Sequence, residues 1–283
     1  MEKPGSHEYK TPKYYEWRVI GYDAKTGQPL TYDHKPRVEA VDAKAGKYAF
    51  KWIGVDGAEK TATFYRVDAV DVLVSALVVR IFPGQYQYTY EIKNLPSSGT
   101  YLERFIIQTF AADVTPVYGG QFWGGPMSKN IKDYSEGTWF DFADVSDYVQ
   151  INPGQSVTIQ FNSSSPPGLV ECRAGAESEI ESPDEEIPSD MASLFGGYGE
   201  YLRGLTVGPV DNLKNLSAAE DAKYLLAKLP QFRKLGWVTD EALGRYQQQL
   251  KNSDLNSLRA HLDEDLKSEQ ITSEVFAIIQ GMK

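Results

Sequence analysis

The fold is decided by one long stretch of sequence: TYLERFIIQTFAADVTPVYGGQFWGGPMSKN (residues 100–130), TWFDF (138–142) and DYVQINPGQSVTIQF (147–161). Within it, residues 101–111 have the apolar content and alternation of a long β-strand. Residues 156–161 (SVTIQF) predict a second strand, and Pro153-Gly154 before them predicts a tight turn, since proline fixes φ and glycine accepts positive φ. Thr100–Phe161 is therefore interpreted as the second half of an antiparallel β-sandwich.

Further strands are predicted before this stretch. Residues 85–92 (QYQYTYEI) alternate strictly, which places Tyr86, Tyr88, Tyr90 and Ile92 on one face. The other strand candidates cover residues 14–22, 48–53, 61–67 and 70–82. Strands that recur every 10–15 residues without helical patterns between them favour an antiparallel sandwich or barrel over an α/β fold.

The last quarter of the chain changes to a helical pattern. Four helix starts are indicated by capping residues that precede leucines and isoleucines at helical spacing: Ser217, Thr239, Asp254 and Thr272. The predicted fold class is β plus α, with an antiparallel β-sandwich followed by a small α-helical bundle. The expected boundaries are a sandwich over 14–165, an acidic, proline-rich linker over 166–212 and a four-helix module over 213–283.

Four short segments of this sequence carry a resemblance to a known group of proteins. They are SSPPGLVECRAG (164–175), LRGLTVGPV (202–210), GWVTDEAL (236–243) and QITSEVFAII (270–279). They resemble uncharacterised bacterial secreted proteins in which a β-rich region precedes a small helical module of the FIVAR or FIMAH kind. The resemblance implies export from a bacterial cell, and it carries no catalytic motif from which residue roles could be transferred.

Composition and charge exclude several classes of partner. The net charge is −10, which argues against nucleic acid and anionic membranes, because both are bound mainly through lysine and arginine. No apolar run is long enough for membrane insertion. The single cysteine, Cys172, excludes an intrachain disulfide. The first residues, MEKPGSHEYK, lack the pattern of a signal peptide. The expected location is secreted, periplasmic or at the cell surface, with the signal peptide absent from this sequence.

The most distinctive candidate binding segment is a glycine-bracketed aromatic loop. Gly119-Gly120 and Gly124-Gly125 flank Phe122 and Trp123, and Tyr118 lies just before. Tyr118, Phe122 and Trp123 are the candidate ligand-binding residues, since flat aromatic faces suit a sugar or a peptide. The alternative is that the loop folds its aromatic rings back into the core.

A cluster of carboxylates follows this loop. Asp141, Asp144 and Asp147 are spaced by three residues and form a candidate Ca²⁺ site, since calcium takes six to eight oxygen ligands. The alternatives are helix capping or a solvated loop. No other cofactor is expected. Carboxylates among Asp133, Glu136, Asp141 and Asp144 would also serve as the acid and nucleophile of a carbohydrate hydrolase.

The sequence therefore favours a non-catalytic binding or structural protein with a glycan or protein ligand. A carbohydrate-active hydrolase is the enzymatic alternative. A third hypothesis is a building block of an extracellular assembly, in which the arm formed by residues 1–13 self-associates by pairing with a neighbour's edge strand.

Overall fold

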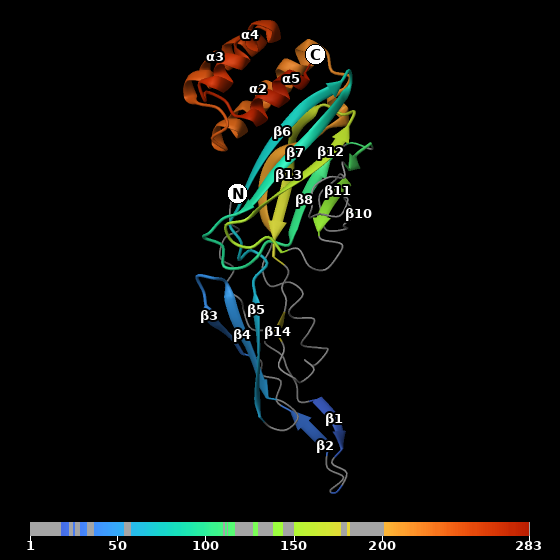
Figure 1. Ribbon diagram of the computed structural model, residues 1–283, viewed down its shortest axis with the longest axis vertical. Helices are drawn as coiled ribbons and strands as arrows, with labels where there is room; N and C mark the ends of the chain where they lie inside the picture. The colour runs from blue at the N-terminus through green and yellow to red at the C-terminus, as the bar shows by residue number, and fades with distance from the viewer. Residues whose placement is uncertain are drawn as a thin grey trace.

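The computed structural model describes residues 18–22, 25, 29–32, 37–53, 58–109, 111, 113–116, 127–129, 138–143, 150–176, 180–181 and 201–282. Figure 1 shows three parts along the long axis of the molecule. A β-sandwich lies in the middle, a helical bundle covers one end, and a smaller sheet with a separate hairpin lies at the other.

The sandwich consists of two antiparallel sheets. The first has the order β10 (Met127–Lys129), β11 (Thr138–Ala143), β8 (Arg104–Thr109), β13 (Pro167–Gly175) and β15 (Leu202–Pro209). The second has the order β6 (Val72–Phe82), β7 (Gln85–Asn94), β12 (Ser156–Ser163) and β9 (Thr115–Pro116). With the helices that follow, this architecture confirms the predicted fold class.

The smaller sheet has the order β14 (Ile180–Glu181), β5 (Glu59–Tyr65), β4 (Lys47–Ile53) and β3 (Arg37–Asp42). It has its own apolar cluster of Phe50, Trp52, Ala62 and Phe64. Strands β1 (Arg18–Tyr22) and β2 (Pro29–Tyr32) form a separate hairpin. The expected extent of the sandwich, residues 14–165, is thus corrected, because the strands before Val72 belong to other sheets with another core.

The expected linker over residues 166–212 is also corrected. Strands β13 and β15 lie inside it and pair antiparallel over eight residues, from Pro167↔Pro209 to Ala174↔Leu202. Val170 and Cys172 are buried while Leu169 and Glu171 are half-exposed, which is the alternation of a half-buried strand over this part of β13. The acidic composition after Glu171 concealed this pattern in the sequence. Residues 182–200 of the expected linker lie outside the described residues.

Tyrosines and phenylalanines dominate the core of the sandwich. Tyr88, Tyr90 and Ile92 are fully buried and Tyr86 nearly so, which confirms the face predicted from the alternation. The Tyr90 hydroxyl donates to the Val207 carbonyl of the opposite sheet (2.6 Å). Phe161 on the neighbouring strand stacks on Tyr88 and Tyr90, with ring centroids 5.1 and 5.7 Å apart. The aromatic layer thus joins both sheets.

The helical region begins with the short 3-10 helix η1 (Asp211–Leu213), followed by α2 (Ala218–Lys234), α3 (Asp240–Lys251), α4 (Leu255–Lys267) and α5 (Ser273–Gly281). Ser217, Thr239 and Asp254 cap their helices as predicted, whereas the side chain of Thr272 makes no capping bond. Pro230 lies in the last turn and a half of α2. No helix among the described residues is long and apolar enough to cross a membrane.

The helices share one apolar core with the sandwich. Helix α5 lies against edge strand β6, and two of its side chains bind the backbone N–H and carbonyl of one residue of that strand. Glu274 Oε1 accepts from the Ala76 N–H (3.0 Å), and Ser273 Oγ donates to the Ala76 carbonyl (3.2 Å). These bonds cover part of a strand edge that would otherwise be unpaired.

Candidate functional site

A groove of about 610 Å³ lies where the edge strands of the two sheets, as the described residues form them, meet the end of helix α2. We call it the edge groove. Its walls come from strands β6, β13 and β15 and from the C-terminal end of α2: Val72, Leu73, Val74, Glu171, Cys172, Arg203, Gly204, Leu205, Gln231, Lys234, Leu235 and Trp237. The volume falls in the range of ordinary ligand sites, about 300–1,000 Å³.

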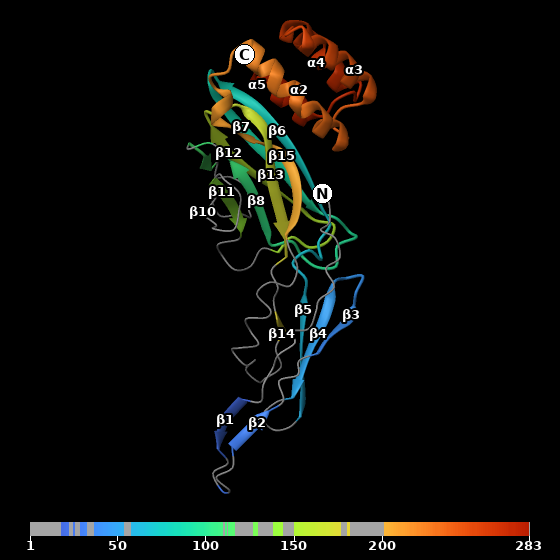
Figure 2. The ribbon, with the colours of Figure 1, turned by 180° about the vertical axis from the view of Figure 1, so that it is seen from behind.

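The groove exists because both sheets end on the same side of the sandwich. Strand β6 is the edge of one sheet and β15 is the edge of the other, and Figure 2 shows the two strands close together beside the helices. Helix α5 packs against both strands and covers β6 at Ala76. The segment of β6 from Val72 to Val74 lines the groove instead.

Backbone groups of β6 point into this opening. The Ala76 N–H and carbonyl point away from β7, since they bind Glu274 and Ser273. In an antiparallel pair this orientation recurs at every second residue. The peptide groups of Val74 and Val72 therefore also point outward, toward the edge groove.

On the opposite wall of the groove, peptide groups of β15 also point outward. Glu171 directs its N–H away from β15, to Gln108 Oε1 (3.4 Å), so it forms a non-hydrogen-bonded pair with Leu205. The peptide groups of Leu205 then point outward, as do those of Arg203 two residues earlier. The Val207 carbonyl, two residues later, has this orientation too and accepts from Tyr90.

The turn that ends α2 forms the rim of the groove. Gly236 adopts a φ of 74°, its N–H donates to Arg233, and the Trp237 N–H donates to Phe232 (2.9 Å). This pair of bonds is a Schellman motif, which favours glycine at the left-handed position. The turn places Leu235, which is 36% exposed, and Trp237 at the groove.

The charges in the groove differ in sign from the chain as a whole. Arg203 and Lys234 contribute two cations to the lining. The carboxylate there, Glu171, accepts from Arg173 Nε at 3.0 Å.

Cys172 lies beneath the groove and is not a nucleophile. Its side chain is 1% exposed, and burial raises the pKa of the thiol to about 12. A thiolate is the reactive form of cysteine, so the folded protein holds this group in its inert, protonated state.

We therefore expect iodoacetamide to alkylate Cys172 on the order of a thousandfold more slowly in the folded protein than in concentrated guanidinium chloride, at about pH 8. Burial both excludes the reagent and lowers the thiolate fraction. The modified fraction can be followed by mass spectrometry, with glutathione as a control for reagent activity. Comparable rates in the folded and unfolded protein would contradict the burial of this thiol.

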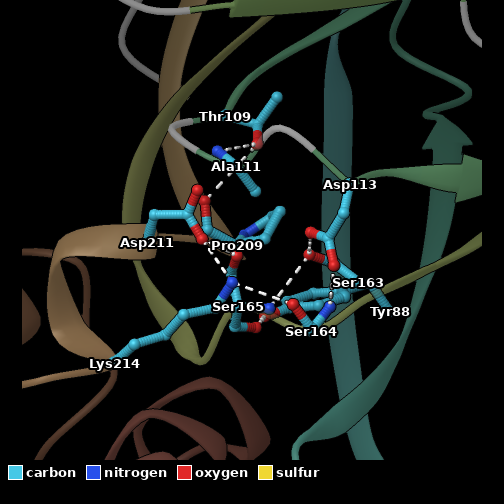
Figure 3. Close-up of polar contacts among 10 residues, drawn as sticks. All are labelled: Tyr88, Thr109, Ala111, Asp113, Ser163, Ser164, Ser165, Pro209, Asp211 and Lys214. Atoms are coloured by element: carbon cyan, nitrogen blue, oxygen red, sulfur yellow. Dashed lines mark hydrogen bonds and ion pairs between the residues drawn. The ribbon is translucent and has the colours of Figure 1, made fainter.

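A second polar cluster lies at one end of the sandwich (Figure 3). The Asp113 carboxylate accepts from Ser163 Oγ and from the Ser164 N–H, both at 2.7 Å. Lys214 contacts Asp211 Oδ1 (2.6 Å) and donates to Ser164 Oγ (2.8 Å). Together these contacts tie the β12–β13 turn to Asp113 and to the start of the helical region.

Electrostatics agree with a structural role for this cluster. Burial alone would raise the pKa of Asp113, but hydrogen bonds from Ser164 and Ser163, with the nearby Lys214, hold it below its usual value. The Tyr88 hydroxyl donates to the Ser165 carbonyl (2.7 Å), and Ser165 Oγ donates to Asp211. All of these contacts are made within the chain. We therefore interpret the cluster as a network that stabilises the fold.

The candidate residues from the sequence lie mostly outside the described residues. This holds for the binding candidates Tyr118, Phe122 and Trp123, and for Asp144 and Asp147 of the proposed Ca²⁺ site. It also holds for the hydrolase candidates Asp133 and Glu136. These assignments remain predictions.

Asp141 is the one sequence candidate with a described backbone. It lies in β11 and pairs with Ile106 and Met127. Within the described residues, no group of three or more His, Cys, Asp or Glu side chains could hold a metal ion.

Sequence reasoning did not find the edge groove. Its residues come from four separate segments. GWVTDEAL was interpreted as a helix start and as part of a resemblance to other proteins. The one local signal was Leu235-Gly236-Trp237, in which glycine follows a helical pattern between two large apolar residues.

The fold is that of a β-sandwich whose open edge is covered in part by a helical bundle. No family model matches the chain, and no curated protein matches it. Slight likenesses exist among solved structures. A chitin-binding domain from Streptomyces coelicolor is 16% identical, with a TM-score of 0.24 over 40% of this chain and 91% of that chain.

Two further solved structures have similarly low TM-scores and sequence identities to this chain. An immunoglobulin-like protein from Nocardia farcinica is 11% identical, with a TM-score of 0.28 over 46% of this chain and 95% of that one. A protein described as membrane anchored, from Corynebacterium diphtheriae, is 12% identical, with a TM-score of 0.25 over 54% of this chain and 44% of that one. TM-scores this low carry no argument about function.

Proposed function

We propose that this chain is a non-catalytic binding protein of the bacterial cell exterior and that the edge groove is its binding site. The observation that carries the proposal is the groove between the edge strands β6 and β15, beside the end of α2. Most of a sandwich edge is a liability that proteins cover. Here one short length lines a groove with an aromatic lip, apolar walls and two cations.

The chemistry of the groove supports binding over catalysis. Its thiol is buried and protonated at neutral pH, and Glu171 is paired with Arg173. The other groups that line it are apolar side chains, cations, the amide of Gln231 and the indole of Trp237. Such a set positions and holds a ligand.

Two finer parts of the proposal come from the sequence alone. They are export from the cell and recognition of a glycan or protein through Tyr118, Phe122 and Trp123. Fractionation of the native host would test the first. The second is distinct from the edge groove and would be tested by the loss of a glycan-induced fluorescence change in Trp123→Ala.

The groove itself can be tested with 1-anilinonaphthalene-8-sulfonate, a probe that joins apolar rings to an anion. We expect the native protein to bind it with enhanced fluorescence. Leu235→Asp is expected to weaken binding about tenfold or more, because losing one buried leucine contact costs about 1.5–3 kcal/mol. The new carboxylate also repels the sulfonate.

Val41→Asp provides the matched control. It makes the same kind of substitution at an apolar side chain that is 57% exposed, but on strand β3 of the smaller sheet. Its dissociation constant is expected to equal that of the native protein. Failure of the native protein to bind, or equal weakening by both substitutions, would contradict a binding site at the edge groove.

A further inference from the structure

Strand β6 carries a row of exposed apolar side chains on the outer face of its sheet. Four of the six large apolar side chains that are exposed in the described part of the chain lie on this strand: Leu73 (53%), Leu77 (53%), Val79 (47%) and Phe82 (64%). We call these four residues the β6 stripe, which only Ser75 interrupts. Single exposed apolar residues are ordinary, whereas a row of them is typical of an interaction site.

The pairing of β6 with β7 shows that the four side chains share one face. The partners are alternate residues of β7, and they lie on the side of that strand opposite the buried Tyr86, Tyr88 and Tyr90. The pairs are Leu73↔Lys93, Leu77↔Thr89, Val79↔Gln87 and Phe82↔Gln85. Residues directly opposite each other in a sheet project to the same face, so the stripe lies outside the sandwich.

A β-bulge brings Phe82 into this row. Val79 and Phe82 are separated by an odd number of positions, so strict alternation would turn them to opposite faces. The register shifts between Arg80 and Phe82, and the extra residue of a bulge re-aims the side chains that follow it. The stripe from Leu73 to Phe82 is therefore roughly 30 Å long, at about 3.3 Å per residue.

The stripe is one strand wide. The outward rows of the neighbouring strands are polar: Gln85, Gln87, Thr89, Glu91 and Lys93 on β7, and Ser156, Thr158, Gln160 and Asn162 on β12. Neighbouring strands lie about 4.8 Å apart, so a helix about 10 Å in diameter would cover the stripe and the row beside it. A second sandwich packed on this sheet would also bury Glu91 and Lys93, and burying charges is costly.

The apolar area of the stripe also suits a single helix better than a second copy of the chain. About half of each of its four side chains is exposed, which amounts to on the order of 300–400 Å². A stable protein–protein interface buries about 800 Å² on each partner. A dimer would have to take the rest of that area from the polar rows of β7 and β12.

Backbone hydrogen bonding separates a helix from an extended strand. A strand that lies on the face of a sheet leaves its own N–H and carbonyl groups without partners, whereas a helix bonds its backbone internally. The edge of β6, where a strand would pair, is occupied at Ala76 by Ser273 and Glu274. Helix α5 already packs against this strand, so a helix on the stripe would extend an existing helix–strand interface.

We propose that the β6 stripe is the docking surface for an amphipathic α-helix of a partner protein. This inference goes beyond the binding role of the edge groove, which adjoins the stripe at Leu73. The helix has apolar side chains at every third or fourth position, and about 20 residues span the stripe. Because Glu91 and Lys93 beside the stripe have opposite signs, the polar face of the helix carries both signs of charge.

The experiment measures binding of a labelled helical peptide to the full chain by fluorescence anisotropy. The peptide is three repeats of LEKLLKE, which has leucines on one face, no net charge and a helical length of about 30 Å. The control peptide has the same composition, with its leucines distributed around the helix. Both peptides are kept dilute to prevent self-association. We expect the first to bind and the control to bind about tenfold or more weakly, because it lacks an apolar face.

Variants of the protein locate the peptide on the stripe. Leu77→Thr is expected to weaken the first peptide about tenfold, because it removes an apolar contact from the middle of the stripe. Threonine favours strands and pairs well with the opposite Thr89, so the fold is retained. Val79→Thr repeats the test at the next outward position.

Two substitutions serve as matched controls. Leu77→Met keeps an apolar side chain of similar volume at the same position. Val41→Thr makes the same kind of change as Val79→Thr at an apolar side chain that is 57% exposed, but on strand β3 of the smaller sheet. Both variants are expected to bind the peptide as the native protein does.

Several results would overturn the proposal. Equal affinity for the two peptides would show that the apolar face is not recognised. Weakening by Leu235→Asp and not by Leu77→Thr would place the peptide in the edge groove. A native dimer that Leu77→Thr dissociates in sedimentation velocity would assign the stripe to a second copy. No binding of the helical peptide, with the sulfonate probe still bound, would remove the stripe as a docking surface and leave the proposed function standing.

Discussion

Replacing Phe161 with alanine is expected to lower the free energy of unfolding by about 3–5 kcal/mol. The ring is 1% exposed and stacks on both Tyr88 and Tyr90. Its removal leaves a cavity between two tyrosines whose hydroxyls are fixed by Ser165 and Val207. Those rings cannot move into the space without breaking their hydrogen bonds, so little of the lost packing is recovered.

Guanidinium unfolding followed by circular dichroism would measure the change. Phe161→Leu keeps most of the volume and is expected to cost about 1–1.5 kcal/mol. Thr158→Ala, on the exposed face of the same strand, should stay within about 0.5 kcal/mol of the native protein. A loss below about 1 kcal/mol for Phe161→Ala would contradict the aromatic layer that joins the two sheets.

Removing the carboxyl group of Glu274 is expected to lower the free energy of unfolding by about 2–3 kcal/mol. Glu274 is 6% exposed, and it is the acceptor for the buried N–H of Ala76. In Glu274→Ala that N–H loses its partner and is still shielded from water. An unsatisfied buried donor costs more than the net worth of the bond it has lost.

The matched control is Glu274→Gln, which retains an acceptor oxygen of the same length and is expected to preserve most of the stability. Chemical denaturation gives the free energies of unfolding, and sedimentation velocity reports any self-association of the variants. Equal destabilisation by alanine and glutamine would show that the charged carboxylate, which both variants lack, matters and that a neutral acceptor oxygen is not sufficient.

Local patterns in the sequence predicted much of the fold. The alternation of Gln85–Ile92 identified the buried face of β7, because neighbours on one strand determine which side chains share a face. Three helix starts were located from the capping residues Ser217, Thr239 and Asp254. These predictions succeeded because a capping bond joins residues within one turn of the helix. The fold class followed from these elements.

What the sequence did not reveal depends on contacts between distant segments. Strands β13 and β15 pair across a connection that includes the acidic residues 182–200, so composition was given more weight than the alternation around Cys172. The division of the strands into separate sheets was missed because the hydrophobic pattern of Lys47–Tyr65 does not indicate which core it joins. The edge groove combines Val74, Leu205 and Trp237, and no local pattern relates them.

The bond between Ala76 and Glu274 spans 198 residues of sequence, and this has a consequence for the newly synthesised chain. A ribosome adds about 5–20 residues per second, so on the order of 10–40 s separate the synthesis of the two partners. Throughout that interval β6 has no α5 to cover it. We expect this strand to be the part of the nascent protein that chaperones must shield longest, and premature termination before α5 to yield chains prone to aggregation.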